Sequence, residues 1–264
     1  MLALSEWSQK DRRQIIGVFT DIDDTLTTEG AITPDALHAL ARLRTAGLHV
    51  VPITGRPVGW SEPFALAWPV DAIVAENGAV ALQHESGQAL TKIYQQDAGT
   101  RADNFVRMQL VGRRVVREVP GAVLSQDSGG RETDIAIDHS EFTHLDAADI
   151  ARTVQIMQAE GMNATVSSIH INGWFGAHNK WAGAQWFVRE RWGRELAEEI
   201  GRWVYVGDST NDQLMFEAFA HSVGVANIRR FESQLEHLPR YITKGERGAG
   251  FAEMVDCLLE ARGV

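Results

Sequence analysis

The sequence predicts an α/β protein with a Rossmann-like parallel-sheet core and an inserted α+β unit. Short apolar runs rich in β-branched residues alternate with helical patterns at both ends of the chain, as in a doubly wound parallel sheet. This alternation stops between residues 85 and 172, where short strand patterns surround one clear helix. We therefore expect residues 1–84 and 173–264 to form one core domain and residues 85–172 to form the insert.

The first part of the core contains three expected strands separated by two expected helices. The first strand is the buried run "IIGVFT" at 15–20. In the helix that follows, Thr33 is the N-cap, Pro34 occupies the first position and Gly47 closes the C-terminus. The remaining elements are a strand at 48–54, a helix at 58–66 and a strand at 71–78 that ends in a turn at Asn77-Gly78.

The pattern of expected strands and helices changes in the insert and changes again where the core resumes. Residues 79–93 resemble a hairpin, and the polar segment "QDSGGRET" is most simply a hairpin connection. The helix of the insert is expected at 146–161, followed by a half-exposed antiparallel strand at 163–172. The core pattern then resumes with helices near 179–192, 211–219 and 247–261, and with strands at 202–208 and 221–226.

Composition excludes several classes of function. The net charge is −10 and no concentrated Lys/Arg stretch is present, which argues against a nucleic-acid partner. No apolar run reaches the roughly 18–20 residues that span a bilayer. The single cysteine, Cys257, excludes an intrachain disulfide and a cysteine-based zinc site. The N-terminus does not resemble a secretory signal, so we expect a soluble cytoplasmic protein whose oligomeric state the sequence leaves open.

Polar clusters follow the expected parallel strands directly. Asp21 and Asp23 follow the first strand, and Thr54-Gly55-Arg56 follows the second. "GDSTND" at 207–212 follows a later strand, and Lys180 lies at the start of the helix that returns to the core. Because ligands of open α/β sheets bind at the carboxyl ends of the strands, we expect these clusters to share one site.

These residue types are suited to phosphoryl transfer. A carboxylate such as Asp21 can attack phosphorus, and Asp23, two residues on, can protonate the leaving oxygen and then deprotonate water. Asp21 and Asp208 offer oxygen ligands to Mg²⁺. The Thr54 hydroxyl, the backbone N–H groups near Gly55 and the Lys180 ammonium can hold the transferring oxygens.

The motifs resemble those of a known superfamily. "DIDDTLT", "ITGR", Lys180 and "GDSTND" are similar to the four ordered motifs of the haloacid dehalogenase-like hydrolases. The long insert, with "ENGA" before it, resembles the Cof-type branch, which includes sucrose-phosphate and mannosyl-3-phosphoglycerate phosphatases. The third motif departs from the pattern, since Trp181 stands where Gly is usual; Lys92 and Lys244 are the alternatives to Lys180.

The resemblance implies a role for each matching residue. It implies that Asp21 is the nucleophile, Asp23 the general acid/base, and Thr54 and Lys180 the residues that hold the phosphate. Its metal ligands would be Asp21, the backbone carbonyl of Asp23, and Asp208, with Asn211 and Asp212 in the outer shell. The aspartate at the position of Asp23 points to a phosphatase or a phosphomutase.

Other residues keep two interpretations. Asp24 is expected to hydrogen-bond the local turn, and Arg56 either binds substrate or closes a salt bridge. We expect the third strand to lie next to the first, which would let Asn77 reach the rim of the pocket. His170 and Asn172 share one face of the last strand of the insert, where they either hang over the active site or are buried for structural reasons.

Together these inferences predict a Mg²⁺-dependent phosphatase whose inserted cap closes over a small phosphorylated metabolite, most simply a sugar phosphate. A phosphomutase would use the same aspartates. A receiver-like signalling protein also uses an acidic pair, a Thr and a Lys, but lacks such an insert. A non-catalytic phosphate-binding protein is the third alternative.

Overall fold

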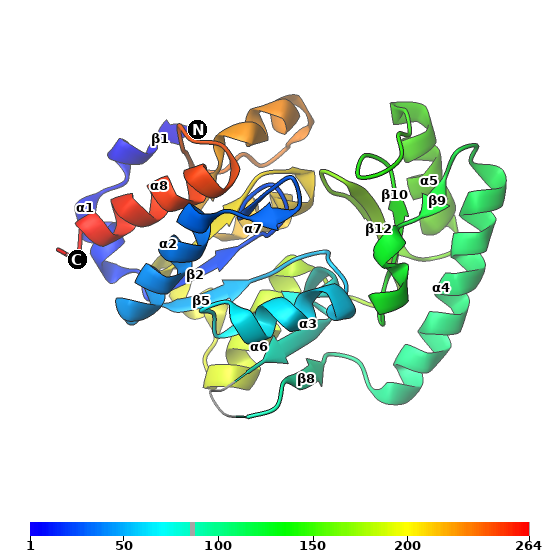
Figure 1. Ribbon diagram of the computed structural model, residues 1–264, viewed down its shortest axis with the longest axis horizontal. Coiled ribbons are helices and arrows are strands. Elements are labelled where there is room, and N and C mark those ends of the chain that lie inside the picture. The colour runs from blue at the N-terminus through cyan, green and yellow to red at the C-terminus, as the bar shows by residue number, and fades with distance from the viewer. Residues whose placement is uncertain (85–87, 264) are drawn as a thin grey trace.

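A six-stranded sheet lies at the centre of the larger lobe in the computed structural model, which describes residues 1–84 and 88–263 (Figure 1). All of its strand pairs are parallel, which confirms the predicted fold class. In spatial order the strands are β1 (Leu2–Ala3), β15 (Tyr241–Ile242), β14 (His221–Gly224), β13 (Trp203–Gly207), β2 (Gly17–Thr20) and β5 (His49–Pro52).

Helices cover both faces of this sheet because its strands are apolar on both sides. Val18 and Val50 contribute to the hydrophobic cluster on one face, and Phe19 and Val51 contribute to the cluster on the other. The first face carries α2 (Pro34–Thr45), α3 (Val58–Ala67) and α8 (Arg247–Glu260), and the second carries α6 (Lys180–Trp192) and α7 (Gln213–Ala218).

The third expected strand lies in a different place from the one predicted. β6 (Ala72–Ala75) is joined to the end of β5 by a single parallel bridge between Ile53 and Val74, so β5 separates it from β2. The prediction that it adjoins the first strand is therefore wrong. β6 pairs antiparallel with β7 (Val80–Gln83), which pairs with β8 (Thr91–Tyr94), as the expected hairpin requires.

The smaller lobe contains a four-stranded antiparallel sheet with the order β11-β12-β10-β9. The strands are β9 (Val123–Leu124), β10 (Ile135–Asp138), β11 (Asn163–Val166) and β12 (His170–Trp174). Two helices, α4 (Ala98–Glu118) and α5 (Ala147–Ala159), pack against the sheet, and α4 forms the outer edge of the molecule (Figure 1). The sequence indicated only one helix here, because Asn104 and Gly112 interrupt the apolar face of α4.

The predicted limits of the insert stay predictions. Residue 85 lies outside the described residues, and β8 at 91–94 falls within the expected insert although it pairs with β7. We call the segment from α4 to β12 the cap. No helix in the described ranges 1–84 and 88–263 is long and apolar enough to cross a membrane.

Shorter elements complete the fold. They are α1 (Gln9–Gln14), the hairpin of β3 (Thr27–Thr28) and β4 (Ala31–Ile32), and the 3₁₀ segments Leu4–Glu6, Glu76–Gly78, Gln126–Gly130, Leu196–Arg202, Thr210–Asp212 and Ala226–Gln234. The segment 210–212 follows β13 and meets the cap, where the Thr210 hydroxyl donates to the Val166 carbonyl at 2.8 Å. The cap therefore lies against the carboxyl ends of the central strands.

Candidate active site

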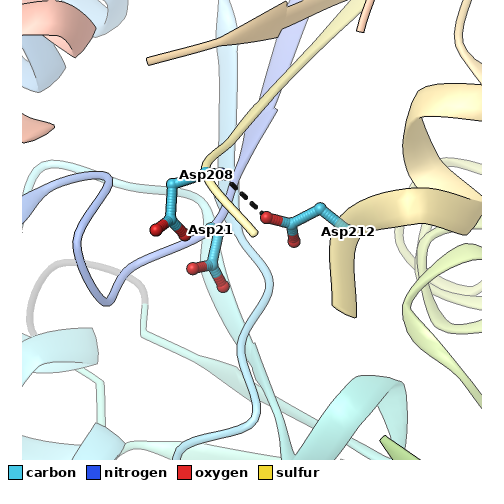
Figure 2. Close-up of side chains that lie close together, drawn as sticks. All are labelled: Asp21, Asp208 and Asp212. Carbon is cyan, nitrogen blue, oxygen red and sulfur yellow. Dashed lines mark hydrogen bonds between the residues drawn. The ribbon is translucent and has the colours of Figure 1, made fainter. Parts of the chain in front are cut away.

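Three buried aspartates meet at the carboxyl ends of β2 and β13. Asp21 follows β2 and Asp208 follows β13, and because these strands are parallel neighbours their ends coincide. Asp212, in the 3₁₀ turn after β13, completes the group (Figure 2). One carboxylate oxygen from each of the three lies within 4.8 Å of the others. The two aspartate motifs predicted to share a site thus do so.

Lys180 is the cation of this cluster. It is the first residue of α6, and its buried ammonium lies 2.6 Å from Asp21 Oδ1 and 2.7 Å from Asp212 Oδ1. The alternative lysines lie elsewhere: Lys92 pairs with Glu62 and Glu132, and Lys244 is an exposed residue after β15. The structure therefore brings Lys180 to the aspartates, as the motif order predicts.

Trp181 does not disturb this arrangement. Its ring packs edge-on against Phe219 at 5.7 Å, in the hydrophobic cluster beneath α6. The position in α6 that requires glycine is Gly183, where an added Cβ would lie 2.4 Å from the Cα of Gly78. The close approach of α6 to the turn after β6 therefore depends on a glycine three residues after Lys180.

Burial makes the ionisation of these groups depend on their partners. It raises the pKa of Asp21 to about 7, although the Lys180 ammonium opposes the shift. Burial, reinforced by the charges of Asp21 and Asp212, raises the pKa of Asp208 well above its ordinary value. Burial lowers the pKa of Lys180, but the two carboxylates beside it outweigh that effect and raise the pKa. The cluster is thus deficient in positive charge.

The donor set fits a divalent cation. Asp208 Oδ1 is buried without a hydrogen-bond partner among the described residues, while Oδ2 accepts from the Asn227 side-chain amide at 3.1 Å. Three carboxylates share one ammonium, and carboxylate oxygens are the ligands that Mg²⁺ prefers. Asp21 and Asp208 are the residues with oxygens to offer.

Asp212 is already occupied by hydrogen bonds. Its Oδ1 accepts from Lys180 and from the Tyr205 hydroxyl, and its Oδ2 accepts from the backbone N–H groups of Asp208 at 2.9 Å and Ser209 at 3.2 Å. This arrangement orients Asp208, and the outer-shell role of Asp212 stays a prediction. Asn211 is half-buried, and its side-chain oxygen accepts from the Ser209 hydroxyl at 2.9 Å.

The segment after β5 supplies a hydroxyl donor. Thr54 is fully buried, and its Oγ1 accepts from the backbone N–H of Arg56 at 3.0 Å, so its own proton remains to be donated. The Gly55 carbonyl accepts from two cap residues, Arg131 at 3.0 Å and Asn172 at 3.2 Å. Cap side chains thereby fix the peptide that carries the predicted phosphate-holding residues.

Arg56 forms ion pairs in this conformation. Its guanidinium lies 2.9 Å from Asp23, 2.8 Å from Glu141 and 3.4 Å from Asp127. Asp23 belongs to the core and the other two acids to the cap, so Arg56 joins the two lobes directly beside the predicted acid/base. Of its two predicted roles, the structure places Arg56 in the salt bridge.

His170, Asn172 and Asn77 each contact an acidic residue of the cap. The His170 ring pairs with Glu141 at 2.9 Å, and the Asn172 amide donates to Asp134 at 3.0 Å. The Asn77 amide lies 3.4 Å from the same Asp134 carboxylate. His170 and Asn172 also line a niche of about 10 Å³ above Asp21 and Asp23, so they lie over the site as one of their two interpretations expected.

Asp24 turns away from the cluster. It adopts φ 55°, its backbone N–H donates to Thr27 Oγ1 at 3.2 Å, and its carboxylate pairs with Arg247 at 3.0 Å. Its backbone thus supports the local turn, as expected, whereas its side chain binds the first residue of α8.

A second buried network, which the sequence analysis missed, joins the cap to the core. Glu76, fully buried, accepts from the backbone N–H groups of Val58, Glu132 and Thr133 and from the Thr133 hydroxyl. Nearby, Arg131 pairs with Asp134 at 2.7 Å and with Asp127. The segment 126–133 does connect antiparallel β9 and β10, but it also anchors the cap. Its arginine and two acids were the signal that could have indicated this.

Comparisons with known proteins are consistent with this geometry. Residues 18–106 match the sequence model of a family described as haloacid dehalogenase-like hydrolases. A Streptococcus pyogenes protein named "Putative phosphatase" is 20% identical, over 90% of this chain and 96% of its own length. The matched segment contains the first two of the four motifs, "DIDDTLT" and "ITGR".

Solved structures share the fold over nearly the whole chain. A "putative HAD/COF-like hydrolase" of Plasmodium vivax superposes with a TM-score of 0.68 at 15% identity, covering 96% of this chain and 99% of its own. The sucrose-phosphatase of Synechocystis, solved with sucrose and phosphate, gives a TM-score of 0.65 at 14% identity, covering 93% and 98%.

Proposed function

We propose that the chain is a haloacid dehalogenase-like hydrolase, and specifically a Mg²⁺-dependent phosphatase that acts on a small phosphorylated metabolite. The observation that carries the proposal is the contact between Asp21 and Lys180 beside the unpartnered oxygen of Asp208. One oxygen of Asp21 is held by the ammonium, which leaves the other available for attack. A divalent cation at Asp21 and Asp208 would offset the repulsion between this carboxylate and an anionic phosphate.

The reaction proceeds in two displacements. An Asp21 oxygen attacks phosphorus, the ester bond breaks, and the leaving oxygen takes a proton from Asp23. Asp23 then removes a proton from water, whose oxygen attacks the aspartyl-phosphate, and Asp21 and inorganic phosphate are released. Thr54 and Lys180 donate hydrogen bonds to the transferring oxygens.

Substrate entry requires the cap to move. The niche above Asp21 has a volume of about 10 Å³, which is barely enough for one water molecule. Arg56 also holds Asp23 in an ion pair that must loosen before this carboxyl group can transfer a proton. We therefore propose that the structure represents a closed state and that the cap opens to admit substrate.

A sugar phosphate is the substrate class that we propose, in keeping with the fold shared with a sucrose-phosphatase. Such an enzyme would act in the cytoplasm on a free metabolite. A phosphomutase remains the alternative, because it uses the same pair of aspartates. The two differ in the fate of the phosphoryl group, which a mutase returns to a sugar.

The direct test is Asp21→Asn assayed on p-nitrophenyl phosphate with Mg²⁺. We expect hydrolysis to fall at least about 10³-fold, because the amide cannot form the acyl phosphate. Asp103→Asn, an exposed substitution on α4, is the control and should retain full activity. Substantial activity in Asp21→Asn would refute the nucleophile, and isomerisation of a sugar phosphate without phosphate release would favour the mutase.

A further inference from the structure

A cavity of about 540 Å³ lies next to the niche above Asp21. The two share Asp23, Arg56 and Ile169 in their walls, so the cavity opens from the position of the proposed acid/base. The acid/base must face the oxygen of the leaving group. The part of the substrate that departs therefore extends into this cavity, which we call the leaving-group cavity.

Acidic side chains outnumber basic ones in the walls of the leaving-group cavity. Four carboxylates line it together with two guanidinium groups, which leaves two negative charges in excess when Asp23 is ionised and one when Asp23 carries the proton for the leaving group. The acids are Asp23, Asp24, Glu29 and Glu141, and the bases are Arg56 and Arg247.

Both guanidinium groups are already paired with acids. Arg56 lies 2.9 Å from Asp23 and 2.8 Å from Glu141, and Arg247 lies 3.0 Å from Asp24. The His170 ring and Arg56 outweigh the effect of burial and hold the pKa of Glu141 below its ordinary value, so its carboxyl group is ionised. No cation in the described part of these walls is left over for an anionic group of the substrate.

The remaining acid and the apolar wall indicate what the cavity accepts. Glu29 is exposed at the rim and makes no ion pair within the described residues, so its carboxylate can accept from hydroxyl or ammonium groups. Phe142, on the cap, is 65% exposed and offers a flat apolar surface to the carbon skeleton of a ring.

We infer that the leaving group is uncharged or cationic: the substrate is a polyhydroxy or amino phosphate monoester whose only acidic group is the phosphate that is removed. This inference rests on the proposed phosphatase activity. A carboxylate or a second phosphate on the leaving group would meet excess negative charge and find no free cation.

Three phosphate monoesters of six-carbon sugar derivatives, which differ in the charge of the rest of the molecule, provide the test. We measure kcat/KM for glucose 6-phosphate, glucosamine 6-phosphate and 6-phosphogluconate by competition against p-nitrophenyl phosphate. The amine should be at least as good as the neutral sugar, and the carboxylate should be poorer by about tenfold, which corresponds to one like-charge interaction at partly solvated distances. A 6-phosphogluconate value equal to or above that of glucose 6-phosphate would overturn the inference.

Reversal of the charge of Glu29 tests whether the leaving-group cavity is the source of this selectivity. Glu29→Lys should reduce the preference for glucose 6-phosphate over 6-phosphogluconate by at least about threefold, because it adds the missing free cation. Glu190→Lys makes the same change of charge near the C-terminal end of α6, whose first residue is Lys180. This control should leave the ratio of the two kcat/KM values unchanged. An unchanged ratio in Glu29→Lys would show that the cavity does not set the selectivity.

A failure of the proposed phosphatase activity can be distinguished from a failure of this inference. If the wild-type protein does not hydrolyse p-nitrophenyl phosphate with Mg²⁺, the phosphatase activity is refuted and this inference with it. If it does, the order of the three phosphate esters decides the inference alone.

Discussion

Three aspartates in four positions each face a different cation. Asp21 contacts Lys180, Asp23 contacts Arg56 and Asp24 contacts Arg247. The sharp turn after β2 separates the three carboxylates in space, so their closeness in the sequence does not translate into one shared acidic cluster. The repulsion that they would otherwise exert is thus distributed over three ion pairs.

Replacement of Lys180 by Gln tests its role as the cation that holds both the nucleophile and the phosphate. We expect kcat for p-nitrophenyl phosphate to fall by about 10²–10³-fold, the usual cost of removing one charged donor from a transition state. Lys244→Gln is the matched control, since Lys244 is exposed and lies outside the site. Comparable activities of the two variants would contradict the assignment.

His178 makes the fold sensitive to acid. Burial alone lowers the pKa of its ring to about 4, and neither ring nitrogen has a hydrogen-bond partner among the described residues. Because the unfolded chain binds this proton more readily, stability is complete above pH 6.5 and decreases as the pH falls toward 4. At pH 5 the loss amounts to about 2 kcal/mol.

The variant His178→Phe keeps the stacking on Trp174, whose ring lies 5.5 Å away, and removes the titration. Urea unfolding at pH 7 and pH 5 should show a smaller decrease for this variant than for the wild type, by about 2 kcal/mol. Equal decreases in the two proteins would assign the acid sensitivity to other groups.

At the scale of elements, local pattern predicted what is buried but not which elements pair. The strands at 17–20, 49–52 and 203–207 were predicted because an uninterrupted β-branched run suits only a strand covered on both faces. The neighbour of β6 was predicted wrongly, because an apolar run does not encode its pairing partner. α4 was missed because polar residues interrupt its buried stripe.

The lack of pairing information in a local pattern also explains which residues of the site were predicted from the sequence. The motif residues were predicted because strand ends converge by topology, whatever the details of packing. The buried network was not predicted, because its contacts join segments more than fifty residues apart and depend on how the cap docks. Its members are Glu76, Arg131 and Asp134.

Glu76 should be essential to the docking of the segment 126–133. Glu76→Gln replaces a carboxylate that accepts four hydrogen bonds by an amide whose NH₂ must face donors, so we expect the free energy of unfolding to fall by about 2–3 kcal/mol. Limited proteolysis should then cut within this segment. Glu132→Gln, in the same segment but half-exposed, should change both measurements far less.

At the scale of the whole molecule, two kinds of contact hold the cap. The network around Glu76 is buried and dense, whereas the opposite contacts are single polar links: Arg56 to Glu141, and Thr210 to Val166. The larger cavity opens on the side of Glu141. We therefore expect the cap to pivot on the network around Glu76 and to open at the single links.

A reversible tether across the opening side tests this motion. Cysteines introduced at Val166 and Thr210, in a Cys257→Ser background, are joined by a short methanethiosulfonate linker that dithiothreitol removes. Because the niche above Asp21 is too small for a phosphoryl group, the tethered protein should lose at least about tenfold of its kcat/KM and recover it on reduction. Either single-cysteine variant treated in the same way is the control. Full activity in the tethered protein would mean that substrate reaches Asp21 without movement of the cap, and the closed conformation would then be the working one.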